Sequence, residues 1–175
     1  MDWKPSDKVL RWRTLAEKWS RQTGCPAALI LAVIQQESGG NPKAAKYEKD
    51  FLRNNPKLEP RVREIMRMCG LSIAQVTTSY GLTQLMLTTA WGYLSAADKG
   101  SDVIAALLDP GKNIRYGAAH LAALRSKCTL PVKGWDGAVV RYAAGRFNGA
   151  GNNSGYARNV CSLWQRYEAL LKETK

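Results

Sequence analysis

Glu37 is the ionisable side chain best placed for acid–base chemistry, because it ends an apolar segment. It follows residues 27–34, eight consecutive apolar or small residues, and then two glutamines. A helix without a polar face is buried, so this run predicts a core helix. Gly39 and Gly40 supply a left-handed cap and Pro42 prevents continuation, which places Glu37 in the last turn.

The last turn of a helix is an unfavourable place for an anion, because the helix carbonyls present partial negative charge there. Together with partial burial, this favours a protonated Glu37 that could act as a general acid. The alternative from these residues alone is that Glu37 simply leaves the core and is solvated.

Other catalytic chemistries have little support in the sequence. His120 is the single histidine and lies in an apolar run, so we expect it in the core or at its boundary rather than beside a Ser or Cys nucleophile. The four cysteines (Cys25, Cys69, Cys128 and Cys161) form no CxxC pair, which disfavours zinc. They fit isolated buried thiols, or two disulfides if the protein works outside the cell. We expect no metal ion and no cofactor.

Two further stretches could line a site. In residues 79–91, Gly81 indicates a tight turn or close backbone approach, and Gln84 offers a donor and an acceptor among apolar neighbours. The alternative is that Leu82, Leu85 and Met86 are ordinary core. Residues 146–155 are rich in glycine and asparagine and predict a loop.

The spacing of apolar residues predicts helices almost everywhere else. The expected helices are 6–23, 27–38, 61–69, from 88 or 89 to 97, 110–125, 137–144 and 156–172. Asp109 and Asp136 are the expected caps of the helices at 110 and 137, and Tyr142 on the latter could be core or cleft. No strand alternation or repeat is seen, so we expect an all-α or nearly all-α fold. The 175 residues predict a single domain, 1–175, with an inserted loop region at about 43–79.

Positive charge is the strongest compositional signal. The formal net charge is +12, which favours a polyanionic partner such as nucleic acid, a membrane surface or an anionic cell wall. Five basic residues within 53–67 could form a basic surface or merely a solvated helix face.

Four motifs in order resemble the soluble lytic transglycosylase and goose-type lysozyme superfamily, in its short phage-like form. They are Glu37-Ser38-Gly39-Gly40-Asn41-Pro42, then Gly81-Leu82-Thr83-Gln84-Leu85-Met86, then Asp109-Pro110 with Asn113-Ile114 and Gly117, and finally Arg141-Tyr142-Ala143-Ala144-Gly145. The likeness covers about residues 25–167.

The resemblance implies a lysozyme-like helical domain with a substrate cleft that cleaves the β-1,4 bond between N-acetylmuramic acid and N-acetylglucosamine in peptidoglycan. Glu37 would act first as acid and then as base, leaving 1,6-anhydro ends. The implied substrate-binding residues are Ser38, Tyr80, Gln84, Met86, Tyr142 and Ala143.

Three residues depart from the family pattern: Thr83 replaces a methionine, Ala143 an asparagine, and Lys46 a serine. A lysozyme-like hydrolysis therefore stays open, with Glu48 or Asp50 able to position a water. Two other hypotheses are a non-catalytic wall-binding or assembly module and a small basic nucleic-acid-binding protein.

The expected setting is that of an endolysin or virion lysin. The N-terminus shows no signal peptide and no run is long enough to cross a membrane, so we expect synthesis in the host cytoplasm and action on the wall in the periplasm or from the virion. We expect a monomer that binds peptidoglycan strands and anionic wall or outer-membrane polymers, without specific nucleic-acid binding.

Overall fold

The fold is described by a computed structural model over residues 4–100, 102–127, 134–146 and 155–173. Its contacts group into two compact units, Met1–Gly40 with Ala118–Lys175, and Asn41–Gly117. The fold is mostly helical, as predicted, with one small sheet. That residues 1–175 form one domain with an insertion at 43–79 stays a prediction.

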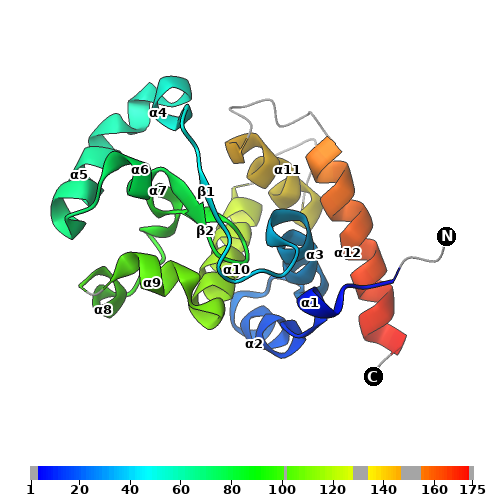
Figure 1. Cartoon of the computed structure of the whole chain (residues 1–175). Coiled ribbons are helices and arrows are strands. Elements are labelled where there is room, and N and C mark those ends of the chain that lie inside the picture. Colours follow the sequence, from blue (N-terminus) through cyan, green and yellow to red (C-terminus); the bar gives the residue numbers. More distant parts are fainter. Residues whose placement is uncertain (1–3, 101, 128–133, 147–154, 174–175) are drawn as a thin grey trace. The chain divides into compact units, whose positions relative to one another are not determined.

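In the first unit, α3 (Ala27–Ser38) is the central helix. It packs against α1 (Asp7–Leu10), α2 (Arg13–Thr23) and α12 (Gly155–Glu173), and Figure 1 shows α12 running beside it. Residues 28–34 of α3 are all buried, which confirms the core helix predicted from the apolar run. The unit also contains α11 (Gly134–Arg146), which packs on α12, and the end of α10 (Pro110–Ser126).

The helix predicted over 6–23 is interrupted between α1 and α2. Trp12 has φ −90° and ψ 2°, so the chain bends there. The Trp12 indole and the Arg11 guanidinium both donate to the Gly40 carbonyl, each at 3.0 Å, and the guanidinium lies over the indole ring. These contacts explain the break, because both side chains must reach one carbonyl beyond the end of α3. The predicted end of this helix at Thr23 is confirmed, and Gly24 follows it with φ 73°.

The second unit contains the antiparallel sheet that the sequence pattern did not reveal. Its strands are β1 (Ala45–Tyr47), β2 (Thr78–Tyr80) and β3 (Leu85–Met86), in the order β1-β2-β3. Ala45 lies opposite Tyr80, and Tyr80 lies opposite Leu85. Strands of two or three residues are too short to produce an alternating pattern.

The rest of this unit is helical. Its helices are α4 (Phe51–Asn54), η1 (Pro56–Leu58), α5 (Glu59–Cys69), α6 (Ile73–Val76), α7 (Leu87–Ala90), α8 (Ala96–Lys99), α9 (Val103–Leu108) and the start of α10. Of these, α7 and α9 contact the sheet. The stop of α5 at Gly70 is confirmed, with φ 65°, although α5 begins two residues before the predicted Arg61.

Further helices of the structure differ from the sequence prediction. The prediction of one continuous helix through Ala97 is wrong. Helix α7 ends at Ala90, and a new helix, α8, begins after its own cap, Ser95. The helix α9 was not predicted. The start of α10 at Pro110 is confirmed, but α11 begins at Gly134, so Asp136 lies in its first turn rather than before it.

Asn113 of α10 fixes the turn between β2 and β3. Its side-chain nitrogen donates to the carbonyls of Tyr80 (3.0 Å) and Leu107 (2.8 Å), and its oxygen accepts from the Thr83 backbone and hydroxyl (both 2.8 Å). Asn113 has no exposed surface, so its amide is fully hydrogen-bonded inside the unit.

Two glycines make room for this contact between α10 and the turn. A Cβ on Gly81, which has φ +74°, would lie 2.4 Å from the Asn113 side-chain nitrogen. A Cβ on Gly117 would lie 2.7 Å from the Thr83 side chain. The second and third motifs of the sequence therefore meet in one packed structure within the second unit.

A buried acidic side chain lies elsewhere in this unit. Asp98 accepts hydrogen bonds from Lys112 (2.5 Å), Ser95 (2.6 Å) and the Tyr116 hydroxyl. The bonds from Lys112, Ser95 and Tyr116 hold the pKa of Asp98 far below its usual range. Burial and the bond to Asp98 raise the pKa of Tyr116 to about 12.

Across the part of the chain that the structure describes, no helix is both long and apolar enough to cross a membrane. Cys25, Cys69 and Cys161 are free thiols. Cys128 lies outside the described residues, and so does the loop predicted at 146–155, apart from its two ends.

Candidate active site

Glu37 lies in the last turn of α3, where the sequence placed it. The helix ends at Ser38, and Gly39 and Gly40 follow with φ 57° and 85°, which confirms the predicted glycine cap. The Gly39 backbone donates to the Gln35 carbonyl at 3.3 Å. Glu37 is half-buried, so its carboxyl group is carried from the core to the surface by an apolar helix.

The turn after Glu37 is held by its neighbours. The Ser38 hydroxyl donates to the Ile34 carbonyl and accepts from the Gly40 backbone, both at 3.2 Å. The Gly40 backbone is pressed against α1, since a Cβ there would lie 2.2 Å from the Lys8 carbonyl oxygen. Ser38, predicted to bind substrate, thus contributes to the local structure of the turn that follows Glu37.

Tyr156 is the direct partner of Glu37. Its hydroxyl donates a hydrogen bond to Glu37 Oε1 from the first turn of α12. No motif in the sequence pointed to a role for Tyr156. The signal that could have found it is its position, immediately after a glycine-rich loop and at the start of a helix that packs along α3.

Aromatic rings extend from this contact into the unit. The Tyr156 ring stacks on Tyr142, with centroids 6.3 Å apart and planes at 24°. The Tyr142 ring meets His120, with centroids 5.7 Å apart and planes at 55°. The structure therefore brings Tyr142, a predicted site residue on α11, into the group that surrounds Glu37, and it places His120 at the core boundary as expected.

Ala143 and Tyr142 are both buried on α11. The small Ala143 side chain is 1% exposed, so it acts in the packing of α11. Its predicted contact with substrate stays a prediction, as do those of Ser38 and Tyr142.

The other predicted site residues belong to the second unit. Tyr80 and Met86 lie on β2 and β3 and are largely buried, and the Tyr80 hydroxyl donates to the Gln75 carbonyl at 2.9 Å. Gln84 has φ 48°, the one described residue other than glycine with positive φ. Its side-chain nitrogen donates to the carbonyls of Ala44 (3.1 Å) and Gly81 (2.9 Å), which stabilises this unfavourable backbone.

Cys25 and Cys161 are poor candidates for a nucleophile. Burial raises the pKa of Cys25 well above its usual value, and burial and the nearby Asp136 carboxylate raise that of Cys161. Both thiols therefore stay protonated and unreactive at neutral pH.

Among the described residues, no group of three or more His, Cys, Asp or Glu side chains is arranged to hold a metal ion.

Comparison with known proteins identifies the family of the chain. Residues 14–159 match the transglycosylase SLT domain family. The chain is also 27% identical, over 151 residues, to the endo-type membrane-bound lytic murein transglycosylase A of Klebsiella pneumoniae (strain 342). It is 27% identical, over 149 residues, to the protein of the same name from Salmonella enteritidis PT4 (strain P125109).

Each match covers 84% of this chain and 59% of the relative. The chain thus spans well under two thirds of the length of these relatives.

Proposed function

Because the chain belongs to the transglycosylase SLT domain family, we propose that it is a peptidoglycan lytic transglycosylase with Glu37 as its catalytic acid and base. The observation that supports this most directly is the hydrogen bond from Tyr156 to Glu37 at the end of a buried helix. A half-buried carboxyl group held by a tyrosine hydroxyl has a fixed orientation, which general acid–base catalysis requires.

In the proposed reaction, Glu37 gives its proton to the glycosidic oxygen as the bond from the muramoyl anomeric carbon to that oxygen breaks. The resulting carboxylate then takes the proton of the muramoyl C6 hydroxyl, whose oxygen bonds to the anomeric carbon. Glu37 ends protonated, no water is consumed, and the product carries a 1,6-anhydro ring.

One carboxyl group is sufficient for this sequence of steps, and the chain is consistent with that. Residues 137–167, which contain Tyr142 and Tyr156, include no Asp or Glu, and neither do residues 65–97. Most glycosidases use two carboxyl groups. In the first unit, we propose that Ser38 and Tyr142 contribute to sugar binding beside Glu37, with Ala143 supporting them through the packing of α11. For the second unit by itself, we propose that Tyr80, Gln84 and Met86 contribute to sugar binding.

The positive charge supports a wall substrate. A net charge of +12 attracts the protein to phosphate-rich or acidic wall and outer-membrane polymers. A role as an endolysin or virion lysin stays a prediction. Detection of the protein in virions would support a virion lysin, and lysis of cells that express it together with a pore-forming protein would support an endolysin.

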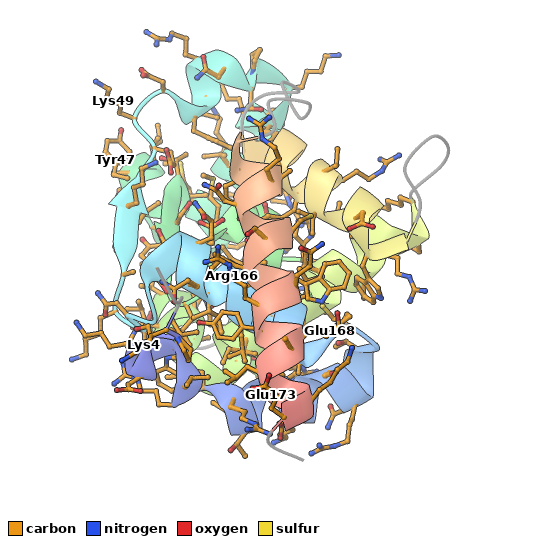
Figure 2. All side chains as sticks on the ribbon, turned by 90° about the vertical axis from the view of Figure 1, so that its right-hand side faces the viewer. Lys4, Tyr47, Lys49, Arg166, Glu168 and Glu173 are labelled. Atoms are coloured by element: carbon orange, nitrogen blue, oxygen red, sulfur yellow. The ribbon has the colours of Figure 1, made fainter. Side chains whose placement is uncertain are left out.

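Substitution of Glu37 tests the catalytic assignment. We expect Glu37→Gln to lower the rate of peptidoglycan clearing by at least roughly 10³-fold, because the amide cannot donate or accept the proton. Glu168→Gln is the matched control, since Glu168 is exposed on α12 and pairs with Lys172 on the surface. Figure 2 shows Glu168 on this helix, on a different side from Arg166. Clearing that survives unchanged in Glu37→Gln would remove Glu37 from the mechanism, whereas a parent chain that clears no peptidoglycan would favour the wall-binding or assembly hypothesis.

Product analysis separates transglycosylation from hydrolysis. Mass spectra of the released muropeptides should show anhydro ends, each lighter by one water than the reducing end that a hydrolase leaves. Reducing ends would instead support the lysozyme-like alternative, with Glu48 or Asp50 as candidates for holding the water.

A further inference from the structure

A polar pocket lies between α3 and α12 in the first unit. It has a volume of about 370 Å³, within the range of small-molecule sites. Its lining residues are Gln35, Gln36, Asn159, Ser162, Leu163 and Arg166. Five of the six carry hydrogen-bonding side chains, none is acidic, and the one charge is the Arg166 guanidinium. This composition suits a ligand with a carboxylate and further polar groups.

The residues that line the pocket lie close to Glu37 and Tyr156 along the two helices. On α12, Tyr156, Asn159, Leu163 and Arg166 are spaced i, i+3, i+7 and i+10, so they share one face. Asn159 lies about 4.5 Å along the helix axis from Tyr156, the partner of Glu37. On α3, Gln36 directly precedes Glu37. A molecule bound at Glu37 could therefore extend a substituent into the pocket.

The buried side of the pocket is pre-organised. The Tyr167 hydroxyl donates to Gln35 Oε1 at 3.1 Å, and burial raises the pKa of Tyr167 to about 12, so this donor stays protonated. The bond fixes the Gln35 amide plane and engages its oxygen. The Gln35 Nε2 hydrogens then remain for an acceptor such as a peptide carbonyl.

We propose that this pocket binds the stem peptide of peptidoglycan, with Arg166 holding a peptide carboxylate. The amides of Gln35, Gln36 and Asn159 pair with peptide groups, and Leu163 contacts a small apolar side chain. A guanidinium is suited to a carboxylate because its two parallel N–H groups match the two oxygens. The proposal rests on the proposed function, since it takes the glycan at Glu37 as the source of the attached peptide.

A binding experiment tests the pocket without catalysis. The probe is the stem peptide released from peptidoglycan with an amidase, titrated by NMR into the full chain. Arg166→Gln should weaken binding by about fivefold, as expected for an exposed charge-assisted contact. Amidating the peptide carboxylates should weaken binding equally.

The matched control for the titration is Arg158→Gln, an exposed arginine of the same helix outside the pocket, which should leave binding unchanged. Equal affinity of the parent chain and Arg166→Gln, or no saturation below roughly 10 mM, overturns the proposal.

A kinetic experiment distinguishes this proposal from the proposed function. Cleavage is compared on glycan strands with their peptides and on strands stripped by the amidase. Arg166→Gln should lower kcat/KM about fivefold on the first substrate and leave it unchanged on the second. Equal effects on both substrates, or none on either, contradict a peptide site. If the parent chain cleaves neither substrate, the proposed function fails, and the peptide titration alone decides the binding site.

Discussion

The hydroxyl of Tyr156 donates a hydrogen bond to the carboxyl group of Glu37, joining the first turn of α12 to the last turn of α3. The two residues are 119 positions apart in the chain. The packing of α12 along α3 brings them together, and the stack of Tyr156 on Tyr142 restricts how the tyrosine can turn. The orientation of the Glu37 carboxyl group thus depends on the packing of a helix that is distant in the sequence.

Removing this hydrogen bond should slow catalysis strongly and destabilise the fold only slightly. We expect Tyr156→Phe to lower kcat by roughly 10- to 100-fold, because this hydrogen bond orients Glu37 and stabilises the carboxylate that forms once Glu37 has given up its proton, an interaction of about 1.5–3 kcal/mol. The ring stack with Tyr142 is retained, so the urea midpoint should fall only slightly. The measurement is kcat on purified peptidoglycan beside a urea unfolding curve.

Tyr47→Phe is the control for this prediction. Tyr47 lies on β1, is 53% exposed and is labelled in Figure 2, so loss of its hydroxyl should leave unfolding unchanged. If Tyr156→Phe retains full kcat, the hydrogen bond to Glu37 has no part in the reaction.

The sequence was sufficient to find Glu37 but not its partner. The position of Glu37 follows from local signals, an apolar run and two glycines, which act within one turn of helix. The contact with Tyr156 depends on how α3 and α12 pack, and no local pattern encodes such a distant pairing. Tyr142 is an intermediate case. Its motif was predicted from the resemblance to a family, but its stacking on Tyr156 was not predicted.

Asn113 should be among the most sensitive positions for stability. We expect Asn113→Ala to lower the free energy of unfolding by roughly 3–5 kcal/mol, because it leaves the buried carbonyls of Tyr80 and Leu107 and the Thr83 donors without their partner. Urea unfolding followed by circular dichroism measures the loss. Asn54→Ala, at an exposed position of α4, should change stability by less than about 0.5 kcal/mol. Equal losses in the two variants would mean that the Asn113 network does not stabilise the fold.

The buried carboxylate Asp98 should give a pH-dependent contribution to stability. Its pKa in the folded chain lies below its usual value, so the stabilisation is present at neutral pH and is lost as the pH falls below about 4. Asp98→Asn should therefore lower the free energy of unfolding by roughly 2 kcal/mol at pH 7, and this difference should shrink towards pH 3.

Urea unfolding curves at several pH values test this expectation. Asp50→Asn is the control, because Asp50 pairs with Arg53 on the surface and should contribute little to stability at pH 7. A difference for Asp98→Asn that stays constant from pH 7 to pH 3 would contradict the role given to its charge.

The fold was predictable where a helix carries its own signals. Helix α3, the glycine stops of α2 and α5 and the proline start of α10 were all predicted from such residues. The break at Trp12 and the strands of the second unit were not, because tertiary contacts determine them. Trp12 and Arg11 leave the helix to reach Gly40, and the β2–β3 turn is shaped by Asn113 from α10.

The two glycines after Glu37 should respond differently to the same substitution. Both have positive φ, so alanine costs about 1 kcal/mol of backbone strain at either position. At Gly39 a Cβ would meet nothing within 4 Å, whereas at Gly40 it would lie 2.2 Å from the Lys8 carbonyl oxygen.

We therefore expect Gly39→Ala to lower the free energy of unfolding by about 1 kcal/mol and Gly40→Ala by roughly 3 kcal/mol or more. Gly40→Ala should also reduce kcat, because the turn must move away from α1 and Gly40 is held there by Arg11 and Trp12. Urea unfolding and kcat measured on both variants provide the test, and equal losses would show that contact with α1 does not fix the turn after Glu37.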